Sequence, residues 1–397
     1  MAMTESVSII DVDTHVTPSA DVLQYFGSEE LSRRWNEVSP FVIDQNPDRP
    51  GERHVFRVRP IAFRRRPGTR AGEAGAVADR PAFGVGGVAQ ASAQGTGAIA
   101  VADVSDRNSA LRLKDMDVEG VDQHVLIPGV WASACTVLPA DLALLLYASY
   151  HRYMDEYCSA DVRRLRGVMV IPGQDAETGA QWIRRYGEEP WCGAAQLLLP
   201  EGMPVDVPEL EPIWQALDEQ RLPLIIHPFT YEPPYFPGYR DIWDNIVVAR
   251  TAALPWNAQR FLAYLVLGGV LDRWPHVRVG FMETSSGWLH WWLKRLDMNM
   301  HYLSHAVDPP AKPIIEYVRN GQVSCAIELY EGAETAKTLI DLCGDGCILY
   351  SSDYPHSECE WPESPAVVRG WATIIGEGAV RKIFSDNPAR FLARNFD

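Results

Sequence analysis

The sequence predicts a (β/α)8 TIM barrel with a long insertion after its first strand. Eight short runs rich in Val, Ile and Leu recur along the chain, and stretches with helical periodicity follow them. Such continuous apolar runs are typical of strands buried on both faces of a parallel sheet. An open, doubly wound sheet is the alternative, but no Gly-x-Gly-x-x-Gly follows the first run.

The elements are predicted in the following order. Strands are expected at Val7–His15, Gln123–Gly129, Gly167–Pro172, Ala194–Pro200, Pro223–Pro228, Val277–Glu283, Gln322–Glu328 and Cys347–Asp353. Helices are expected at Leu138–Ala160, Asp175–Tyr186, Pro208–Gln220, Asn257–Trp274, Ser286–Ser304, Gly332–Leu342, Pro365–Ile375, Ala379–Phe384 and Pro388–Asn395. Asp175 is a candidate N-cap, and so is Asn387, which precedes a proline suited to the first helical position.

The chain divides into three expected parts. Residues 1–16 carry the first barrel strand, residues 17–110 form an inserted arm or lid that is partly flexible, and residues 111–397 complete the barrel. Residues 64–102 are rich in Arg, Gly and Ala with few large apolar side chains, so they build little core. The arm would cover an active site or grip a neighbouring subunit. A disordered surface loop is the alternative for residues 64–102.

Composition excludes several classes of protein. The 397 residues include 36 Lys and Arg against 52 Asp and Glu, a formal net charge of −16, which argues against a dedicated nucleic-acid binder. The apolar run Phe261–Leu271 is too short to span a membrane. The first residues lack the features of a signal peptide, and the seven cysteines match no disulfide framework. We therefore expect a cytoplasmic protein with reduced thiols and no membrane partner.

Ligand-type side chains close five of the eight predicted strands, where the catalytic groups of a parallel barrel lie. Asp13 and His15 are two residues apart, so both should face the barrel interior and share one metal ion, with Asp11 one layer deeper on the same face. The other strand-end residues are His227, Glu283, Glu328 and Asp353. Taken singly, each could instead be a solvated strand end, a structural histidine or a turn residue.

Other residues are candidates for contacts with a substrate. Trp131, Tyr231 and Trp256 lie near predicted βα loops and would form an aromatic wall, although the chain is rich in aromatic residues throughout. Arg240 would bind a carboxylate, and Glu328 would contact the substrate from the seventh strand. His356, three residues after Asp353, would face the substrate or donate a hydrogen bond to a carboxylate.

The strand-end motifs together resemble the amidohydrolase superfamily. They are Asp13-Thr-His15, His227-Pro228 and Ser352-Asp-Tyr-Pro-His356, and the resemblance is closest to the amidohydrolase-related branch that includes aminocarboxymuconate-semialdehyde decarboxylase. It implies a TIM barrel and one divalent metal ion, with zinc expected first and manganese as the alternative. It also implies that Asp13, His15, His227 and Asp353 hold the metal, and that Asp353 handles the proton of a bound water.

One position departs from the family pattern. Several relatives carry a histidine at the end of strand six, where this chain has Glu283. Glu283 either replaces that histidine in proton transfer or holds a neighbouring ligand or arginine in place. No lysine ends the fourth strand, which favours one metal over two.

The expected function is that of a metal-dependent hydrolase. It would act on a small aromatic or cyclic carboxylate, amide or lactone through metal-activated water, with Asp353, Glu283 and His356 as catalytic residues. The first alternative is a non-oxidative decarboxylase of an aromatic or muconate-type acid. The second is a barrel that binds a ligand without catalysis. We expect a small-molecule substrate and a homodimer or higher homo-oligomer, as the resemblance implies.

Overall fold

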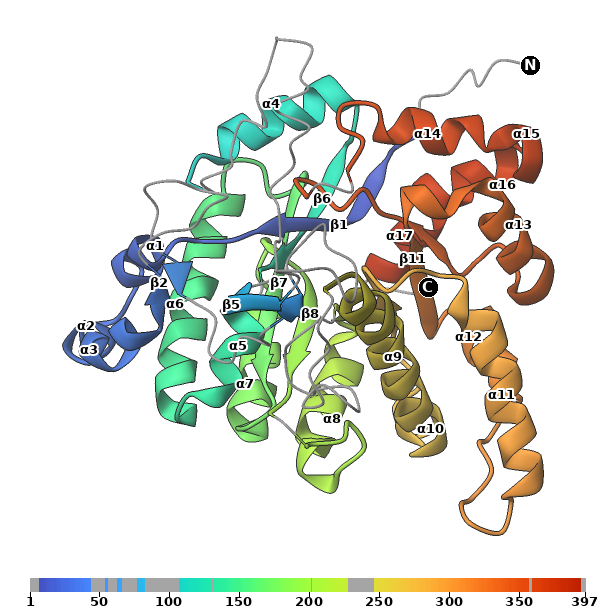
Figure 1. Cartoon of the computed structure of the whole chain (residues 1–397), viewed down its shortest axis with the longest axis horizontal. Helices are drawn as coiled ribbons and strands as arrows, with labels where there is room; N and C mark the ends of the chain where they lie inside the picture. The colour runs from blue at the N-terminus through green and yellow to red at the C-terminus, as the bar shows by residue number, and fades with distance from the viewer. Residues whose placement is uncertain are drawn as a thin grey trace.

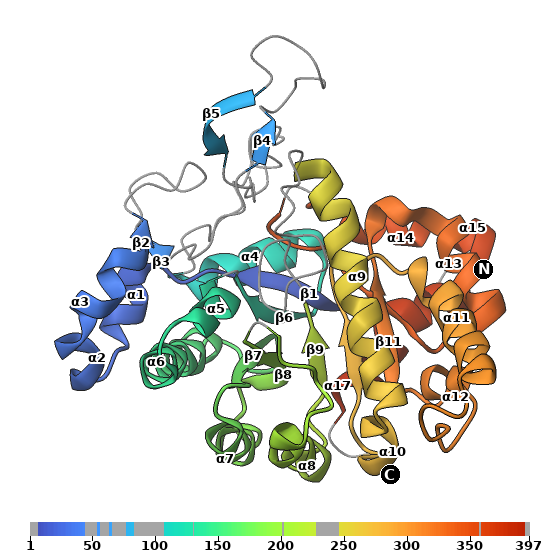
Figure 2. The same ribbon diagram turned by 60° about the horizontal axis from the view of Figure 1, so that its bottom comes forward.

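The computed structural model describes residues 7–43, 54–55, 63–65, 77–82, 107–129, 131–200, 202–227, 246–356 and 359–393. Eight parallel strands make one sheet in the order in which they follow along the chain, so the predicted TIM barrel is confirmed (Figures 1 and 2). The strands are β1 (Ile10–Val16), β6 (Gln123–Pro128), β7 (Leu165–Pro172), β8 (Cys192–Leu198), β9 (Leu224–Ile226), β10 (Val279–Phe281), β11 (Val323–Ile327) and β12 (Ile348–Tyr350).

The barrel closes between its first and last strands. The segment after β12 runs beside β1, where the His15 amide donates to the Tyr354 carbonyl at 2.7 Å and the Asp353 amide donates to the Asp13 carbonyl at 3.0 Å. This seam therefore joins the two stretches that carry the Asp-x-His motif and Asp353.

Helices alternate with the strands and surround them (Figure 2). The helices after the second strand are α5 (Trp131–Ala134), α6 (Ala140–Cys158), α7 (Ala176–Tyr186), α8 (Glu211–Gln220), α9 (Ile246–Leu267), α10 (Val270–Arg273), α11 (Trp288–Tyr302) and α13 (Gly332–Cys343). The chain ends with α14 (Ser364–Gly370), α15 (Ala372–Ile375), α16 (Glu377–Arg381), a π-helical turn at Lys382–Asp386 and α17 (Asn387–Leu392). Among the helices of the barrel, α5, α4 (Ser109–Glu119) and α12 (Ile314–Arg319) were not predicted.

The two N-cap predictions have different outcomes. Asp175 caps α7, because its carboxylate accepts from the Thr178 amide at 3.0 Å. Asn387 is instead the first residue of α17. Its side-chain amide donates to the Asp345 carbonyl at 2.8 Å and to the Ile348 carbonyl at 2.9 Å, so it fastens the helix to the start of β12. A buried tertiary contact therefore replaces the local cap.

Two apolar layers hold the barrel together. The interior layer comprises Val12, Val125, Ile127, Val168, Ala194, Ile225, Met282, Ala326, Leu349 and Phe391. Phe391 from α17 lies so close to β10 that a Cβ at Gly280 would approach its ring to 2.7 Å. The larger layer lies between strands and helices and includes Val16, Leu126, Phe281 and Tyr350. Along β6, for example, Val125 and Ile127 belong to the interior layer and Leu126 to the outer one, which shows which side chains point inward.

Part of the predicted insertion packs against the barrel. Helices α1 (Ala20–Tyr25), α2 (Glu29–Arg33) and α3 (Trp35–Val38) bury Leu23, Leu31 and Val38 and lie beside α6 in both views (Figures 1 and 2). The backbone pairs β2 (Val42–Ile43) with β3 (His54–Val55), and β4 (Phe63–Arg65) with β5 (Val77–Ala82). Most of residues 64–102 lies outside the described residues. Across the part of the chain that is described, no helix is long and apolar enough to cross a membrane.

Candidate metal centre

Strand β1 delivers Asp13 and His15 to the barrel interior through an irregular register. Its pairing with β6 shifts between Asp11 and Thr14, so alternation along the strand breaks there. Ile10 and Val12 pack with the interior layer before this bulge, and Asp13 and His15 lie in the same interior cluster after it. The expectation that Asp11 shares their face is wrong. The Asp11 carboxylate accepts from the amides of Asp13 and Ser352, and its charge acts on Tyr350 in the outer layer.

The ends of β9 and β10 add an imidazole and a carboxylate. His227 follows β9 and is buried, with Nε2 at 3.7 Å from Asp13 Oδ1 and 3.1 Å from Glu283 Oε2. Because Met282 points into the barrel, the next residue of a regular strand would point outward. Glu283 instead has a φ of 47°, in the left-handed region. This strained turn accompanies the approach of its carboxylate to His227.

Asp353 and His356 reach the cluster from the segment after β12. Asp353 also has a left-handed backbone, with a φ of 60°. Its Oδ1 lies 2.9 Å from His15 Nε2 and 2.6 Å from His356 Nδ1, and the two imidazole rings stack with their centroids 4.1 Å apart. Side chains as far apart in the sequence as Asp13 and His356 thus meet in one buried cluster.

These side chains fit a divalent metal ion. One set of mutually close ligand atoms comes from Asp13, His15 and His227, and another comes from His15, Glu283, Asp353 and His356, with every atom of a set within 4.8 Å of the others. Among the described residues, neither Asp13 oxygen takes part in a hydrogen bond and His15 Nδ1 has none, although both side chains are buried. Buried polar atoms of this kind favour a ligand, and a mixture of imidazole and carboxylate suits zinc, manganese or iron.

The charges of the cluster also favour a cation. Burial raises the pKa of Asp13 to about 7; His227 opposes this shift, whereas the carboxylates of Asp353 and Glu283 reinforce it. Burial and the charges of Asp13 and Asp353 raise the pKa of Glu328 well above its usual range. Burial acts in the same direction on Asp353 and Glu283, but neighbouring histidines outweigh it and lower the pKa of both carboxyls. A divalent cation would relieve the repulsion between these carboxylates.

Two interior side chains border the cluster. Glu328 lies two residues after the inward-facing Ala326 and is buried, and its backbone amide donates to Glu331. Gln196 lies two residues after the inward-facing Ala194, and its side chain donates to the His227 carbonyl at 3.3 Å. The sequence analysis did not select Gln196. Its signal was a single amide in an otherwise apolar strand.

A buried arginine supports the β1 side of the cluster. Arg112 on the unpredicted helix α4 donates to the His15 carbonyl and to the Tyr157 hydroxyl, and its guanidinium lies over the ring of Tyr354. The Tyr354 hydroxyl in turn donates to Asp115 at 2.6 Å. Such outer contacts fix the orientation of the ligands. The sequence analysis did not select Arg112.

The aromatic candidates lie in different surroundings. Trp131 is 1 % exposed and packs against Tyr150 of α6, so most of its ring is enclosed in the outer layer. Trp256 lies half-buried on α9, and its indole N–H has no hydrogen-bond partner among the described residues. Tyr231 and Arg240 lie outside the described residues.

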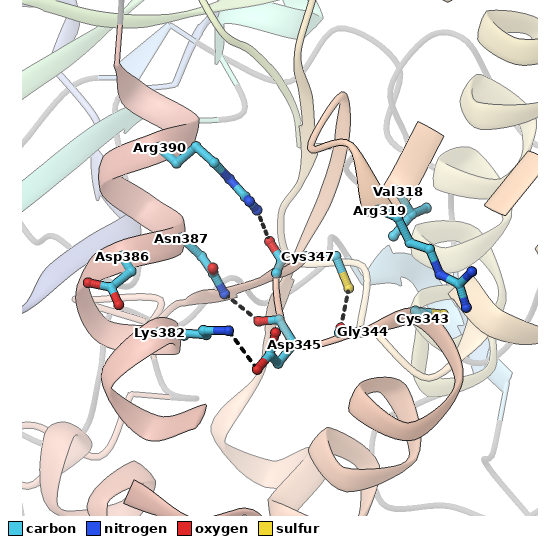
Figure 3. Close-up of a pocket in the computed structure, with 11 residues that line it drawn as sticks. Val318, Arg319, Cys343, Gly344, Asp345, Cys347, Lys382, Asp386, Asn387 and Arg390 are labelled. Carbon is cyan, nitrogen blue, oxygen red and sulfur yellow. Dashed lines mark hydrogen bonds and ion pairs between the residues drawn. The ribbon is translucent and has the colours of Figure 1, made fainter. Parts of the chain in front are cut away.

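A hollow of about 350 Å³ lies at the opposite, amino-terminal end of the barrel (Figure 3). The loop 343–347 that precedes β12 forms one wall, and the chain segment 382–390 forms another. Lys382 pairs with Asp345 at 2.8 Å, and Arg390 donates to the Gly346 carbonyl. None of the predicted site residues lines this hollow.

Fold and cluster together define a (β/α)8 protein with a buried, metal-competent site at the carboxyl ends of its strands. The amidohydrolase family model matches residues 10–394, and the chain belongs to that family. The match confirms the predicted family, and with it the prediction of an enzyme, whether hydrolase or carboxy-lyase. No protein of curated function matches the sequence.

Solved structures share the fold at low sequence identity. An amidohydrolase from Mycobacterium avium subspecies paratuberculosis has a TM-score of 0.71 at 16 % identity, covering 98 % of this chain and 100 % of that one. The 5-carboxyvanillate decarboxylase from Sphingomonas paucimobilis has a TM-score of 0.66 at 18 % identity, covering 98 % and 99 %. A dihydroxybenzoic acid decarboxylase from a Polaromonas species, with bound manganese and the inhibitor 2-nitroresorcinol, has a TM-score of 0.63 at 16 % identity, covering 98 % and 97 %.

Proposed function

We propose that the chain is a metal-dependent, non-oxidative decarboxylase of an aromatic hydroxy acid. The observation that carries this proposal is the buried cluster of imidazoles and carboxylates at the strand ends. Two of the similar structures are decarboxylases of phenolic acids, which supports the choice of decarboxylation over hydrolysis. We therefore prefer decarboxylation, which was the first alternative from the sequence, to hydrolysis, which was the main expectation.

Asp13, His15, His227 and Asp353 would hold the metal, with Glu283 and His356 close enough to contribute ligand atoms. When bound, a divalent cation would supply Lewis-acid polarisation of substrate oxygens. Manganese becomes the first candidate and zinc the second, since manganese is bound in the Polaromonas structure.

The protein's own side chains would handle the proton. In decarboxylation of a hydroxybenzoate, a ring carbon gains a proton, the bond from that carbon to the carboxylate breaks, its electron pair restores the ring, and carbon dioxide leaves. His356, joined to the Asp353 carboxylate at 2.6 Å, would deliver this proton, and Asp353 would hold the protonated imidazole until the transfer. Glu283 would orient His227 through their 3.1 Å contact.

Hydrolysis of an amide or lactone is the second candidate. It draws support from Glu283, which stands where several relatives carry the strand-six histidine. In that reaction Asp353 would accept the proton of the attacking water and His356 would return a proton to the leaving group.

One experiment distinguishes the two reactions. Protein loaded with Mn²⁺ or Zn²⁺ would be offered dihydroxybenzoates and 5-carboxyvanillate, and separately a panel of aryl amides and lactones. The proposal predicts metal-dependent release of carbon dioxide and an equal amount of the decarboxylated phenol. Asp353→Asn should abolish the release. Turnover of amides or lactones without any carbon dioxide would contradict decarboxylation and favour hydrolysis.

A further inference from the structure

Two hydroxyl-bearing residues follow β10 and β11 and have no part in the proposed proton transfer. Ser285 comes two residues after Glu283, and Tyr330 comes two residues after Glu328 in the 3-10 turn Leu329–Glu331. Their side-chain oxygens are 2.9 Å apart, in hydrogen-bonding contact. Both therefore lie on βα loops at the same end of the barrel as the metal-competent cluster.

The half-buried carboxylate of Glu331 fastens these two loops together. It accepts from the Ser286 amide at 2.8 Å, the Ser286 hydroxyl at 2.9 Å and the Gly287 amide at 3.1 Å. It also accepts from the Glu328 amide at 3.0 Å. Four donors from two loops thus converge on one side chain, at the start of α11, where a negative charge is also favoured by the helix dipole.

This arrangement holds an aromatic ring in the open. Tyr330 is 68 % exposed, yet its hydroxyl is tied to Ser285, whose backbone is itself held in the left-handed region at a φ of 56°. An exposed ring that is free to rotate needs no explanation. A ring whose hydroxyl is bonded to a strained neighbour, on loops joined by Glu331, is pre-organised.

The Tyr330 hydroxyl is near enough to the cluster for the charges of Glu328 and Glu283 to act on it. Burial of this hydroxyl, reinforced by the negative charge of Glu328, raises the pKa of Tyr330 to about 12. The phenol therefore stays neutral at physiological pH. A neutral ring beside several carboxylates can stack on a planar substrate without adding to the charge repulsion.

We propose that Tyr330, held by Ser285 and Glu331, forms a substrate-contacting wall that stacks on the ring of an aromatic acid. The proposal deepens the proposed function, on which its choice of substrate class rests. Tyr330 is the contacting residue, whereas Ser285 and Glu331 are positioning residues that act through it.

Binding of 2-nitroresorcinol to the Mn²⁺-loaded protein tests the wall without requiring turnover. This nitrophenol absorbs visible light, so its affinity can be followed by absorbance titration. Tyr330→Ala should weaken its binding about 3- to 10-fold, the range expected for loss of one ring–ring contact. Mn²⁺ binding should be unchanged. Tyr302→Ala, which removes a similarly exposed tyrosine of α11, is the matched control and should bind like the wild type.

Two further variants separate contact from positioning. Tyr330→Phe and Ser285→Ala should each weaken 2-nitroresorcinol binding by less than Tyr330→Ala does. Because both substitutions remove the same hydrogen bond, the double variant should lose no more affinity than the single variant with the larger loss. Additive losses would contradict a positioning role for Ser285.

The failures of the two proposals are distinguishable. A wild-type protein that binds 2-nitroresorcinol but releases no carbon dioxide from hydroxybenzoates would contradict the proposed decarboxylase activity. The proposed contact of Tyr330 with the ring would then be tested by the variants alone. Tyr330→Ala with wild-type affinity would overturn the wall. So would a Mn²⁺-loaded wild type that binds neither 2-nitroresorcinol nor 4-hydroxy-3-methoxy-5-nitrobenzoic acid.

Discussion

The two ends of the barrel use polar side chains in opposite ways. At the amino-terminal end, Lys382, Asn387 and Arg390 meet defined partners in the loop before β12 (Figure 3). At the carboxyl end, buried atoms of Asp13 and His15 have no hydrogen bond, and Glu283 and Asp353 adopt left-handed backbones. Satisfied polar groups at one end favour stability, whereas strain and unsatisfied groups at the other favour a ligand.

Removing a metal ligand should have the largest effect. We expect Asp353→Asn and His227→Ala to lose bound metal and at least about 100-fold in turnover, more than the loss of an outer contact typically causes. Elemental analysis beside the activity assay measures both. Asp345→Asn, at the amino-terminal end, is the control and should keep its metal. Full metal content in both ligand variants would refute the assigned site.

Metal binding should stabilise the protein, because it offsets repulsion among buried carboxylates. We expect added Mn²⁺ at about 100 times its dissociation constant to raise the free energy of unfolding by about 2.7 kcal/mol. Thermal unfolding with Mn²⁺ and with a chelator measures the difference. Asp13→Asn removes one of the repelling charges, so its metal-free form should unfold at a higher temperature than the metal-free wild type and respond less to Mn²⁺. Equal melting temperatures with metal and chelator would contradict the interpretation.

A substitution at the amino-terminal end of the barrel should change the stability of the protein and leave its metal binding and turnover unchanged. Asn387→Ala leaves the carbonyls of Asp345 and Ile348 without the side-chain donor. We expect it to lower the free energy of unfolding by about 2 to 6 kcal/mol, from about 1 to 3 kcal/mol for each carbonyl. Urea denaturation measures this loss. Metal content and turnover per folded molecule should match the wild type, and a change in either would show that the two ends are coupled.

Glu119, near Asp11 outside the barrel interior, should make stability depend on pH. Burial raises its pKa from 4.5 to about 8, with the neighbouring Ser364 opposing the shift. Between these values the folded protein keeps the proton that the unfolded chain releases, so this group lowers stability as pH rises from about 4.5 to about 8. Glu119→Gln should flatten that decline and add about 1 to 2 kcal/mol at pH 8. Melting temperatures across pH 5 to 8 test this, and an unchanged slope would argue against it.

The smallest effect is expected for the half-exposed ion pair of Lys382 and Asp345. Exposed pairs contribute little, so Lys382→Ala should cost less than about 1 kcal/mol. Urea denaturation at low and high salt would detect the difference. A cost as large as that of Asn387→Ala would mean that the lining of the amino-terminal hollow contributes more to the free energy of unfolding than its exposure indicates.

Much of the barrel could be read from local pattern. Apolar runs ended by Pro, Gly or acidic residues gave all eight strands, because both faces of a parallel barrel strand are buried and few polar residues are tolerated there. Helices α4 and α12 were missed. Helix α4 carries charged residues that are buried only by long-range partners, as when Arg112 contacts His15 and Tyr354. Periodicity cannot report such contacts.

The site residues divide in the same way. The types and positions of Asp13, His15, His227, Glu283 and Asp353 could be selected from the sequence, because ligand-type side chains at strand ends stand out against apolar runs. The direction of each side chain required coordinates. The bulge in β1 turned Asp11 away from the interior, and a left-handed residue brought Glu283 to His227.

The sequence by itself determined the fold class and the chemical types at the strand ends, since both follow from the burial of short, regular segments. Only the tertiary structure decided which of those groups meet, which remain without hydrogen bonds, and how Glu331 joins the loops of Ser285 and Tyr330. These properties depend on contacts between residues far apart in the chain and on single backbone torsions, neither of which a local pattern encodes.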